Sequence, residues 1–114
     1  MVVDTLTELE VDRIFQALSD ATRRDIFRRV LTDGHSVSTL ARHYEMSFAA
    51  IQKHVSVLEH ATLVTKMKHG REQIVYANIP TLRTAASLLD TFEEIWILRA
   101  TQTAGILGEE GRAS

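Results

Sequence analysis

The chain has 114 residues, which is enough for one domain and too few for a second hydrophobic core of ordinary size. It contains no cysteine, which excludes a disulfide-stapled secreted module, a thiolate nucleophile and a metal site with sulfur ligands. The net charge is −2, yet residues 20–76 carry nine basic side chains against six acidic ones, and all five histidines. A weakly basic middle between acidic ends permits a nucleic-acid surface without demonstrating one.

The composition is typical of a soluble globular protein, with 45% hydrophobic and 25% charged residues. Residues 1–10 hold three acidic side chains and no basic one, which is unlike a signal peptide. No uncharged apolar run approaches the roughly 18 residues of a membrane-spanning helix. We therefore expect a cytoplasmic protein with no membrane partner.

Two short helices are predicted at the start of the chain. Apolar residues at helical spacing predict a first helix that ends near Ser19. Asp20 is then expected to cap a second helix, which Asp33 and Gly34 end. The apolar faces are Val11, Ile14, Phe15 and Leu18 in the first helix, and Ile26, Phe27, Val30 and Leu31 in the second.

A helix-turn-helix pair is predicted next. Ser38 is expected to cap a third helix of about seven residues, and Ser47 a fourth helix that runs to about His60. Only Glu45 and Met46 separate the two helices, so we expect them to cross sharply rather than lie alongside each other. The inner faces are Leu40, Ala41 and Tyr44 in the third helix, and Ile51, Val55 and Leu58 in the fourth.

The spacing changes to a period of two after Leu63, and a β-hairpin with its turn at His69 and Gly70 is predicted there. Pro80 cannot continue the second strand and can open a helix, which is predicted from about Thr81 to Thr103. The predicted division is an N-terminal extension over 1–10, a winged domain over 11–80, a dimerisation helix over 81–103 and a flexible tail over 104–114.

The order helix, helix, helix-turn-helix, β-wing, helix is the winged helix-turn-helix architecture, and three local stretches resemble the ArsR family of bacterial transcriptional repressors. Residues 14–23 resemble that family's "ALSDPTR" opening. Residues 38–41 and 46–59 are similar to its "S-x-L-A … L-S-x-x-x-V-S-x-H-L-x-x-L" core. Residues 63–64, 69–71 and 75–76 look like its wing. The resemblance covers residues 11–80 and implies a mainly α fold with a small β-hairpin, dimeric through its terminal helices.

The chain also departs from the family pattern. Glu45 stands in the turn where relatives often have glycine, which would cost on the order of 1 kcal/mol if that position were left-handed. Ala21 replaces a proline that many relatives have. The metal-sensing members resemble one another in a cysteine-containing pair on the third helix or an aspartate and histidine pair on the last helix. Because the chain has no cysteine and its last helix no histidine, neither sensor site can exist here.

No metal and no cofactor is therefore predicted. The five histidines place no two ligands on one helical turn, and a site across a dimer interface stays open as an alternative. If the protein responds to a signal, the missing sensor sites point to a small organic ligand or a partner protein as effector, or to control by abundance.

The fourth helix is the predicted reader of double-stranded DNA, because a recognition helix turns its N-terminal residues to base edges in the major groove. Gln52 suits adenine, Lys53 suits guanine or phosphate, and Phe48 with Ala49 suits a thymine methyl. The alternative is a merely solvated helix face and a hairpin kept soluble by its charges. The predicted DNA-binding residues are Ser47, Phe48, Ala49, Gln52, Lys53, His54 and Ser56 on the helix, and Lys66, Lys68, His69 and Arg71 on the wing.

The last helix is predicted to form a homodimer, because its apolar face exceeds what a three-helix core can cover. A two-fold dimer places two recognition helices about 34 Å apart, which matches a palindromic operator. The alternative is that the helix only caps its own core. The predicted interface residues are Leu82, Ala85, Leu89, Phe92 and Trp96, with Val2, Val3, Leu6 and Leu9 adding to the same surface.

The resemblance thus implies a sequence-specific, DNA-binding transcriptional regulator, a repressor acting as a homodimer. The alternative is a winged-helix protein-interaction module that has lost DNA binding, which the overall acidity favours. An enzyme is not predicted, because no paired carboxylates, glycine-rich phosphate loop or Ser-His-Asp set occurs in the chain.

Overall fold

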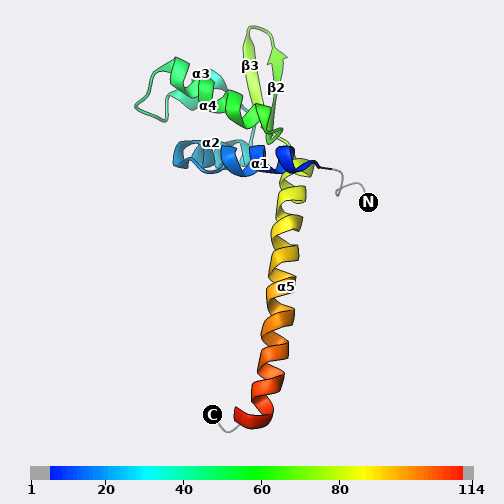
Figure 1. Ribbon diagram of the computed structural model, residues 1–114. Helices are drawn as coiled ribbons and strands as arrows, with labels where there is room; N and C mark the ends of the chain where they lie inside the picture. The colour runs from blue at the N-terminus through cyan, green and yellow to red at the C-terminus, as the bar shows by residue number, and fades with distance from the viewer. Residues whose placement is uncertain (1–5, 112–114) are drawn as a thin grey trace.

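The computed structural model describes residues 6–111, with side chains placed as far as residue 104. Figure 1 shows a head made of α1 to α4 and a small sheet, from which α5 projects as a single long helix. No helix in the described part of the chain is long and apolar enough to cross a membrane. The elements in chain order are α1 (Glu8–Ala17), α2 (Ala21–Thr32), β1 (His35–Ser36), α3 (Val37–Ala41), α4 (Phe48–His60), β2 (Val64–His69), β3 (Glu72–Ala77) and α5 (Ile79–Gly111).

Short polar side chains begin the helices of the head. Asp20 caps α2 by accepting from the Arg23 N–H at 3.0 Å, as the sequence predicted. The first helix starts earlier than predicted, because Thr7 and Glu10 form a capping box that begins α1 at Glu8. The predicted N-terminal extension is therefore partly structured. Leu6 already packs against the core, whereas Val2 and Val3 lie outside the described residues.

The third helix differs from its prediction in both length and cap. Ser36, not Ser38, caps α3, accepting from the Thr39 N–H at 3.0 Å, and the helix ends at Ala41. The connection to α4 therefore spans residues 42–47 rather than two residues. A short strand explains the early start, because β1 pairs antiparallel with β3 and brings the chain into α3 one residue after Ser36. Glu45 is not left-handed, so the turn carries no strain at that position.

The wing is part of a three-stranded antiparallel sheet of order β1-β3-β2, so the predicted hairpin is correct but incomplete. Strands β2 and β3 pair from Val64 opposite Ala77 to His69 opposite Glu72. Gly70 closes the hairpin with a φ of 65°, a conformation that glycine adopts without strain.

The core collects the apolar faces of the head, and Ile51, Val55 and Leu58 of α4 are fully buried in it. The first turns of α5 belong to this core as well, since Ala85 is buried and Leu82 packs against it. Further along α5, Leu89, Phe92 and Trp96 are 53%, 56% and 67% exposed. The alternative that the last helix only covers its own core is therefore correct for the start of α5 and not for the rest of the helix.

The last helix is longer than predicted. Its backbone continues past Thr103 to Gly111, so residues 104–111 of the predicted tail are helical, while residues 112–114 lie outside the described part. The sequence predicted an end near Thr103 because residues 105–111 hold three glycines, which are poor helix formers, yet the backbone stays helical through them.

Candidate nucleic-acid interface

Helix α4 has one buried face and one face open to solvent. The burial of Ile51, Val55 and Leu58 fixes its rotation in the head. Its start is fixed by Ser47, whose Oγ accepts from the Ala50 N–H at 3.1 Å. Five of the side chains that the sequence predicted to face DNA are consequently exposed on the opposite face: Phe48, Ala49, Gln52, Lys53 and Ser56.

Phe48 is the most unusual member of this face. It is an aromatic side chain that is 46% exposed at the first position of the helix, next to Met46, which is 41% exposed. Exposing such apolar groups to water is unfavourable. A thymine methyl in the major groove is one surface that can cover them. The positive end of the helix dipole at the same place favours a nearby phosphate.

His54 lies apart from the five exposed residues. Its Nδ1 is 3.4 Å from Nη1 of Arg23 and 3.9 Å from Oδ2 of Asp20, so the ring packs against the start of α2. Only 21% of its side chain is exposed. The structure therefore ties His54 to the head, and its predicted contact with phosphate has no support from its position.

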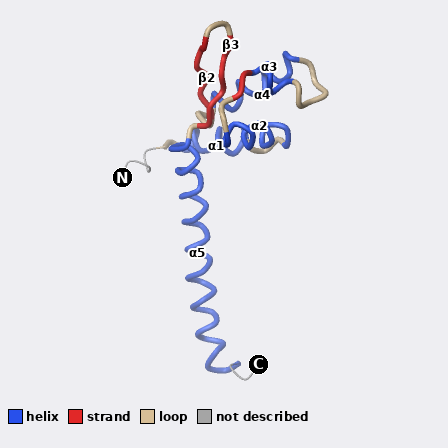
Figure 2. Tube along the Cα trace, turned by 180° about the vertical axis from the view of Figure 1, so that it is seen from behind, coloured by secondary structure: helices blue, strands red, loops and turns tan. Residues whose placement is uncertain are grey.

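The wing brings two kinds of basic side chain to the surface. Lys66 is half-buried and its Nζ lies 3.3 Å from Oε1 of Glu59 on α4, so its charge is already paired. Lys68, His69 and Arg71 are exposed at the tip, where the His69 ring also contacts the Tyr76 hydroxyl at 3.3 Å. The view from behind in Figure 2 shows the hairpin and the α3–α4 pair together on the side of the head away from α5.

The head also holds the helix-turn-helix with a polar cluster that the sequence analysis missed. The Tyr44 hydroxyl donates to Oδ2 of Asp25 at 2.6 Å, and Arg29 donates to the same oxygen at 3.0 Å while its guanidinium stacks on the Tyr44 ring. The Tyr44 hydrogen bond is the main reason why the pKa of Asp25 lies below its usual value. This cluster joins α2 to the turn that precedes α4. In the sequence, Asp25 and Arg29 stand out only as an i, i+4 pair on the second helix, and Tyr44 only as part of the inner face of the third.

Arg23 makes a second such connection. Its guanidinium donates to the carbonyls of Ala17 and Gln16, at 2.8 and 3.1 Å, and so caps the C-terminal end of α1. For Arg23 the structure shows a structural role within the head.

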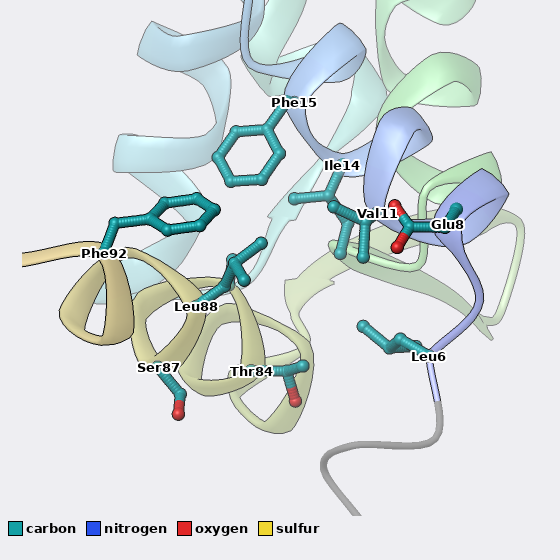
Figure 3. A pocket seen from close by; sticks show the side chains of 10 residues that line it. Leu6, Glu8, Val11, Ile14, Phe15, Thr84, Ser87, Leu88 and Phe92 are labelled. Carbon is teal, nitrogen blue, oxygen red and sulfur yellow. The ribbon is translucent and has the colours of Figure 1, made fainter. Parts of the chain in front are cut away.

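A groove between α1 and α5 lies at the other end of the head and has a volume of about 560 Å³. Figure 3 shows Phe15 of α1 and Phe92 of α5 pointing toward one another across it, with Leu88 beside them. Among the predicted interface residues, Leu89, Phe92 and Trp96 are open to a partner. Ala85 is not, because its own chain buries it. The surface available for dimerisation is therefore shifted along α5 relative to the prediction.

The fold agrees with the comparisons with known proteins. A helix-turn-helix domain family matches residues 18–66. The chain is 35% identical over 100 residues to the HTH-type transcriptional regulator Rv2034 of Mycobacterium tuberculosis, covering 88% of this chain and 91% of that protein. It is 27% identical over 71 residues to the transcriptional repressor SdpR of Bacillus subtilis, covering 62% of this chain and 77% of SdpR.

Solved structures lead to the same family. The ArsR-like transcriptional regulator from Rhodococcus sp. RHA1 superposes with a TM-score of 0.76 at 33% identity, covering 86% of this chain and 92% of that one. The chain belongs to the ArsR family of winged helix-turn-helix transcriptional regulators.

Proposed function

We propose that the protein is a repressor that binds a palindromic operator as a homodimer and reads its sequence with α4. The observation that carries this proposal is the open face of α4, on which Phe48, Gln52 and Lys53 are exposed while the opposite face is locked into the core. A rigidly held helix with donors, a cation and an apolar group at its N-terminal end is what direct readout in the major groove requires.

Each exposed group has a matching partner on DNA. The Gln52 amide pairs with adenine through two hydrogen bonds, and Lys53 donates to guanine O6 and N7 or to a phosphate. Ala49 and Phe48 contact a thymine methyl. Lys68, His69 and Arg71 at the wing tip contact the phosphate backbone beside the site, which sets the register of α4 without reading sequence.

Two features support the homodimer. Leu89, Phe92 and Trp96 follow one another at helical spacing on α5, and each is more than half exposed. The groove between α1 and α5 adjoins this surface at Phe92, and its volume of about 560 Å³ offers room for side chains of a second α5. Isologous packing of two copies buries both, and it sets two α4 helices on successive major grooves about 34 Å apart.

Repression follows from occupancy, because a dimer covering a promoter keeps other proteins off the same DNA. The name of SdpR, a relative that is 27% identical over 71 residues, supports a repressor. An effector that releases the DNA would be a small organic molecule or a protein, since the chain lacks the thiolates of one metal-sensing class and the last-helix histidine of the other.

The proposal is tested by fluorescence anisotropy with a duplex from the DNA just upstream of the coding region, against a random duplex of equal length, at two salt concentrations. We expect nanomolar affinity for the upstream duplex and a steep loss with salt, because phosphate contacts release counterions. Lys53→Ala and Gln52→Ala should each cost about 1–3 kcal/mol, roughly 5- to 150-fold, on the upstream duplex and less on the random one.

Arg28→Gln is the matched control, because Arg28 is 72% exposed on α2 and bonds only within that helix, to Asp25. It should leave both affinities unchanged. If the wild-type protein binds neither duplex at low salt, the proposal fails and the interaction module that has lost DNA binding becomes the better interpretation. The search would then turn to protein partners of α5.

A further inference from the structure

A second groove runs between α1 and α4, on the side of α4 that continues its open face. Its volume is about 360 Å³. Val57 and Ala61 contribute its apolar part, and polar side chains from the two helices make up the rest: Arg13 and Gln16 from α1, and Lys53, Ser56 and His60 from α4.

The groove is lined by basic and neutral groups only. Three acidic residues stand close to the lining residues in sequence, and none of them lines the groove: Glu10 closes the capping box of α1, Glu59 pairs with Lys66, and Asp12, next to Arg13, is exposed outside the groove. Within residues 6–104, no carboxylate lies within 4.0 Å of the side-chain nitrogens of Arg13 or Lys53. Two permanent cations thus share one concave site without a counter-charge, which favours an anionic ligand.

We propose that this groove binds a backbone phosphate of the DNA that α4 contacts, with Arg13 as its anchoring cation. The inference rests on the proposed function and extends it to α1, an element that the sequence analysis did not place at the DNA. Lys53 and Ser56 line the groove and also belong to the open face of α4, so a duplex lying on that face brings its backbone to the groove edge.

The chemistry of the lining fits a phosphodiester. The Arg13 guanidinium offers a planar pair of N–H donors that matches two phosphate oxygens, and Lys53 supplies a second positive charge. Ser56 and Gln16 add neutral donors on opposite walls of the groove. Because a phosphate contact carries no base information, Arg13 positions α4 on the duplex and does not select the operator.

This role separates Arg13 from Lys53 and Gln52 in a binding experiment. We expect Arg13→Gln to weaken binding to the upstream duplex and to the random duplex by the same factor, about 5- to 10-fold at moderate salt. The magnitude of the slope of log K against log salt should fall by about 0.9 for each phosphate that Arg13 no longer neutralises, which counts twice in a symmetric dimer. Arg13→Lys should keep most of the slope, because it keeps the charge.

Arg28→Gln again serves as the charge-matched control and should change neither affinity nor slope. Arg13 is exposed, so thermal unfolding of Arg13→Gln should coincide with that of the wild type. An unchanged slope in Arg13→Gln, with wild-type DNA binding intact and Gln52→Ala weakened, would overturn this inference and leave the proposed function standing. Absence of DNA binding in the wild type would overturn both.

A free anion is the other source of the same chemistry, and a separate titration distinguishes it. Inorganic phosphate added to the protein alone, at constant ionic strength, should perturb the His60 ring resonances weakly or not at all. Tight saturable binding of phosphate that Arg13→Gln abolishes, with no effect of the same substitution on DNA affinity, would contradict the DNA assignment.

Discussion

The head and the projecting part of α5 both carry apolar helix faces, but they differ in how much of that apolar surface they bury. In the head, every helix turns an apolar stripe inward, and Ile26, Ile51 and Leu58 have no exposed surface at all. Along α5 beyond Leu88, the apolar residues are as large, yet Trp96 is 67% and Ile95 61% exposed. Both regions carry a helical apolar pattern, but only the first finds its partner surface within one chain.

The head buries its apolar residues within one chain, whereas the apolar stripe of α5 needs a second surface to cover it. Burial of apolar area stabilises by roughly 25 cal/mol per Å², and an exposed stripe of this length forgoes that gain until another surface covers it. The head is therefore expected to be stable in dilute solution, whereas the order of α5 beyond the head should depend on protein concentration.

The largest effect should come from a matched pair of leucines, one in each region. Leu58→Ala empties a fully buried site and should lower the free energy of unfolding by about 2–5 kcal/mol at every protein concentration. Leu89→Ala, at a position 53% exposed in one chain, should change it by less than about 0.5 kcal/mol in dilute solution. Urea unfolding at two protein concentrations measures both. If both substitutions lowered the free energy of unfolding equally at low protein concentration, the proposed difference between the head and α5 would be contradicted.

The second prediction concerns assembly. Trp96→Ala should weaken the dimer by about 2–4 kcal/mol, at least 30-fold in its dissociation constant, because large aromatic anchors dominate interfaces. Ile97→Ala is the control, since Ile97 is also exposed but lies about 100° around α5 from Trp96, on the side that carries Asp90 and Glu94. Sedimentation equilibrium distinguishes them. A monomeric wild type, or equal effects of both substitutions, would contradict the assignment of the α5 face.

A smaller effect should come from the polar cluster that holds the helix-turn-helix to α2. Tyr44→Phe removes the hydrogen bond to Asp25 and should destabilise the head by about 1 kcal/mol at pH 7. The pKa of Asp25 is lowered in the folded protein, chiefly by Tyr44, so the stability it contributes is present above its unfolded pKa and is lost as pH falls through the folded value.

Unfolding curves of the wild type and Tyr44→Phe should therefore converge below about pH 4, the region of the unfolded aspartate pKa. Asp25→Asn should show a similarly flattened dependence on pH in this range. A gap between wild type and Tyr44→Phe that stays constant from pH 7 to pH 3 would mean that the hydrogen bond does not depend on the charge of Asp25.

The smallest effect tests local strain at the end of α4. Thr62 has a φ of 59°, and the Thr62 and Leu63 N–H groups donate to the carbonyls of Glu59 and Leu58, the pattern of a Schellman cap. Glycine is the usual residue there, so Thr62→Gly should stabilise the head by about 0.5–1 kcal/mol. Gly70→Ala, at a φ of 65° in the wing, should destabilise by a similar amount. Thermal unfolding that shifts both in the same direction would refute this account.

Features that depend on neighbours in the sequence were predictable. The caps at Asp20 and Ser47, the extent of α4 to His60 and the hairpin turn at Gly70 all follow from local hydrogen bonding and from the spacing of apolar residues, and the structure confirms them. The cap of α3 was wrong by two residues. Ser36 and Ser38 are equally good caps locally, and only the pairing of β1 with β3 chooses between them.

The candidate site also combines features that the sequence predicts with features that depend on tertiary contacts. That Phe48, Ala49, Gln52, Lys53 and Ser56 are exposed follows from the buried stripe of their own helix, which the sequence displays. That Lys66 is paired with Glu59, and that His54 turns to Arg23, depends on distances between elements that periodicity does not carry.

The sequence by itself determined the order of the helices, the β-hairpin and the family, because helix periodicity, caps and turn residues act over a few positions. Only the tertiary structure decided which charges remain available and how far the core reaches along α5. It buried Ala85, left Phe92 and Trp96 open, and brought Arg13 of α1 into the same groove as Lys53 of α4. Such juxtapositions arise from the packing of whole helices against one another, and no local pattern encodes them.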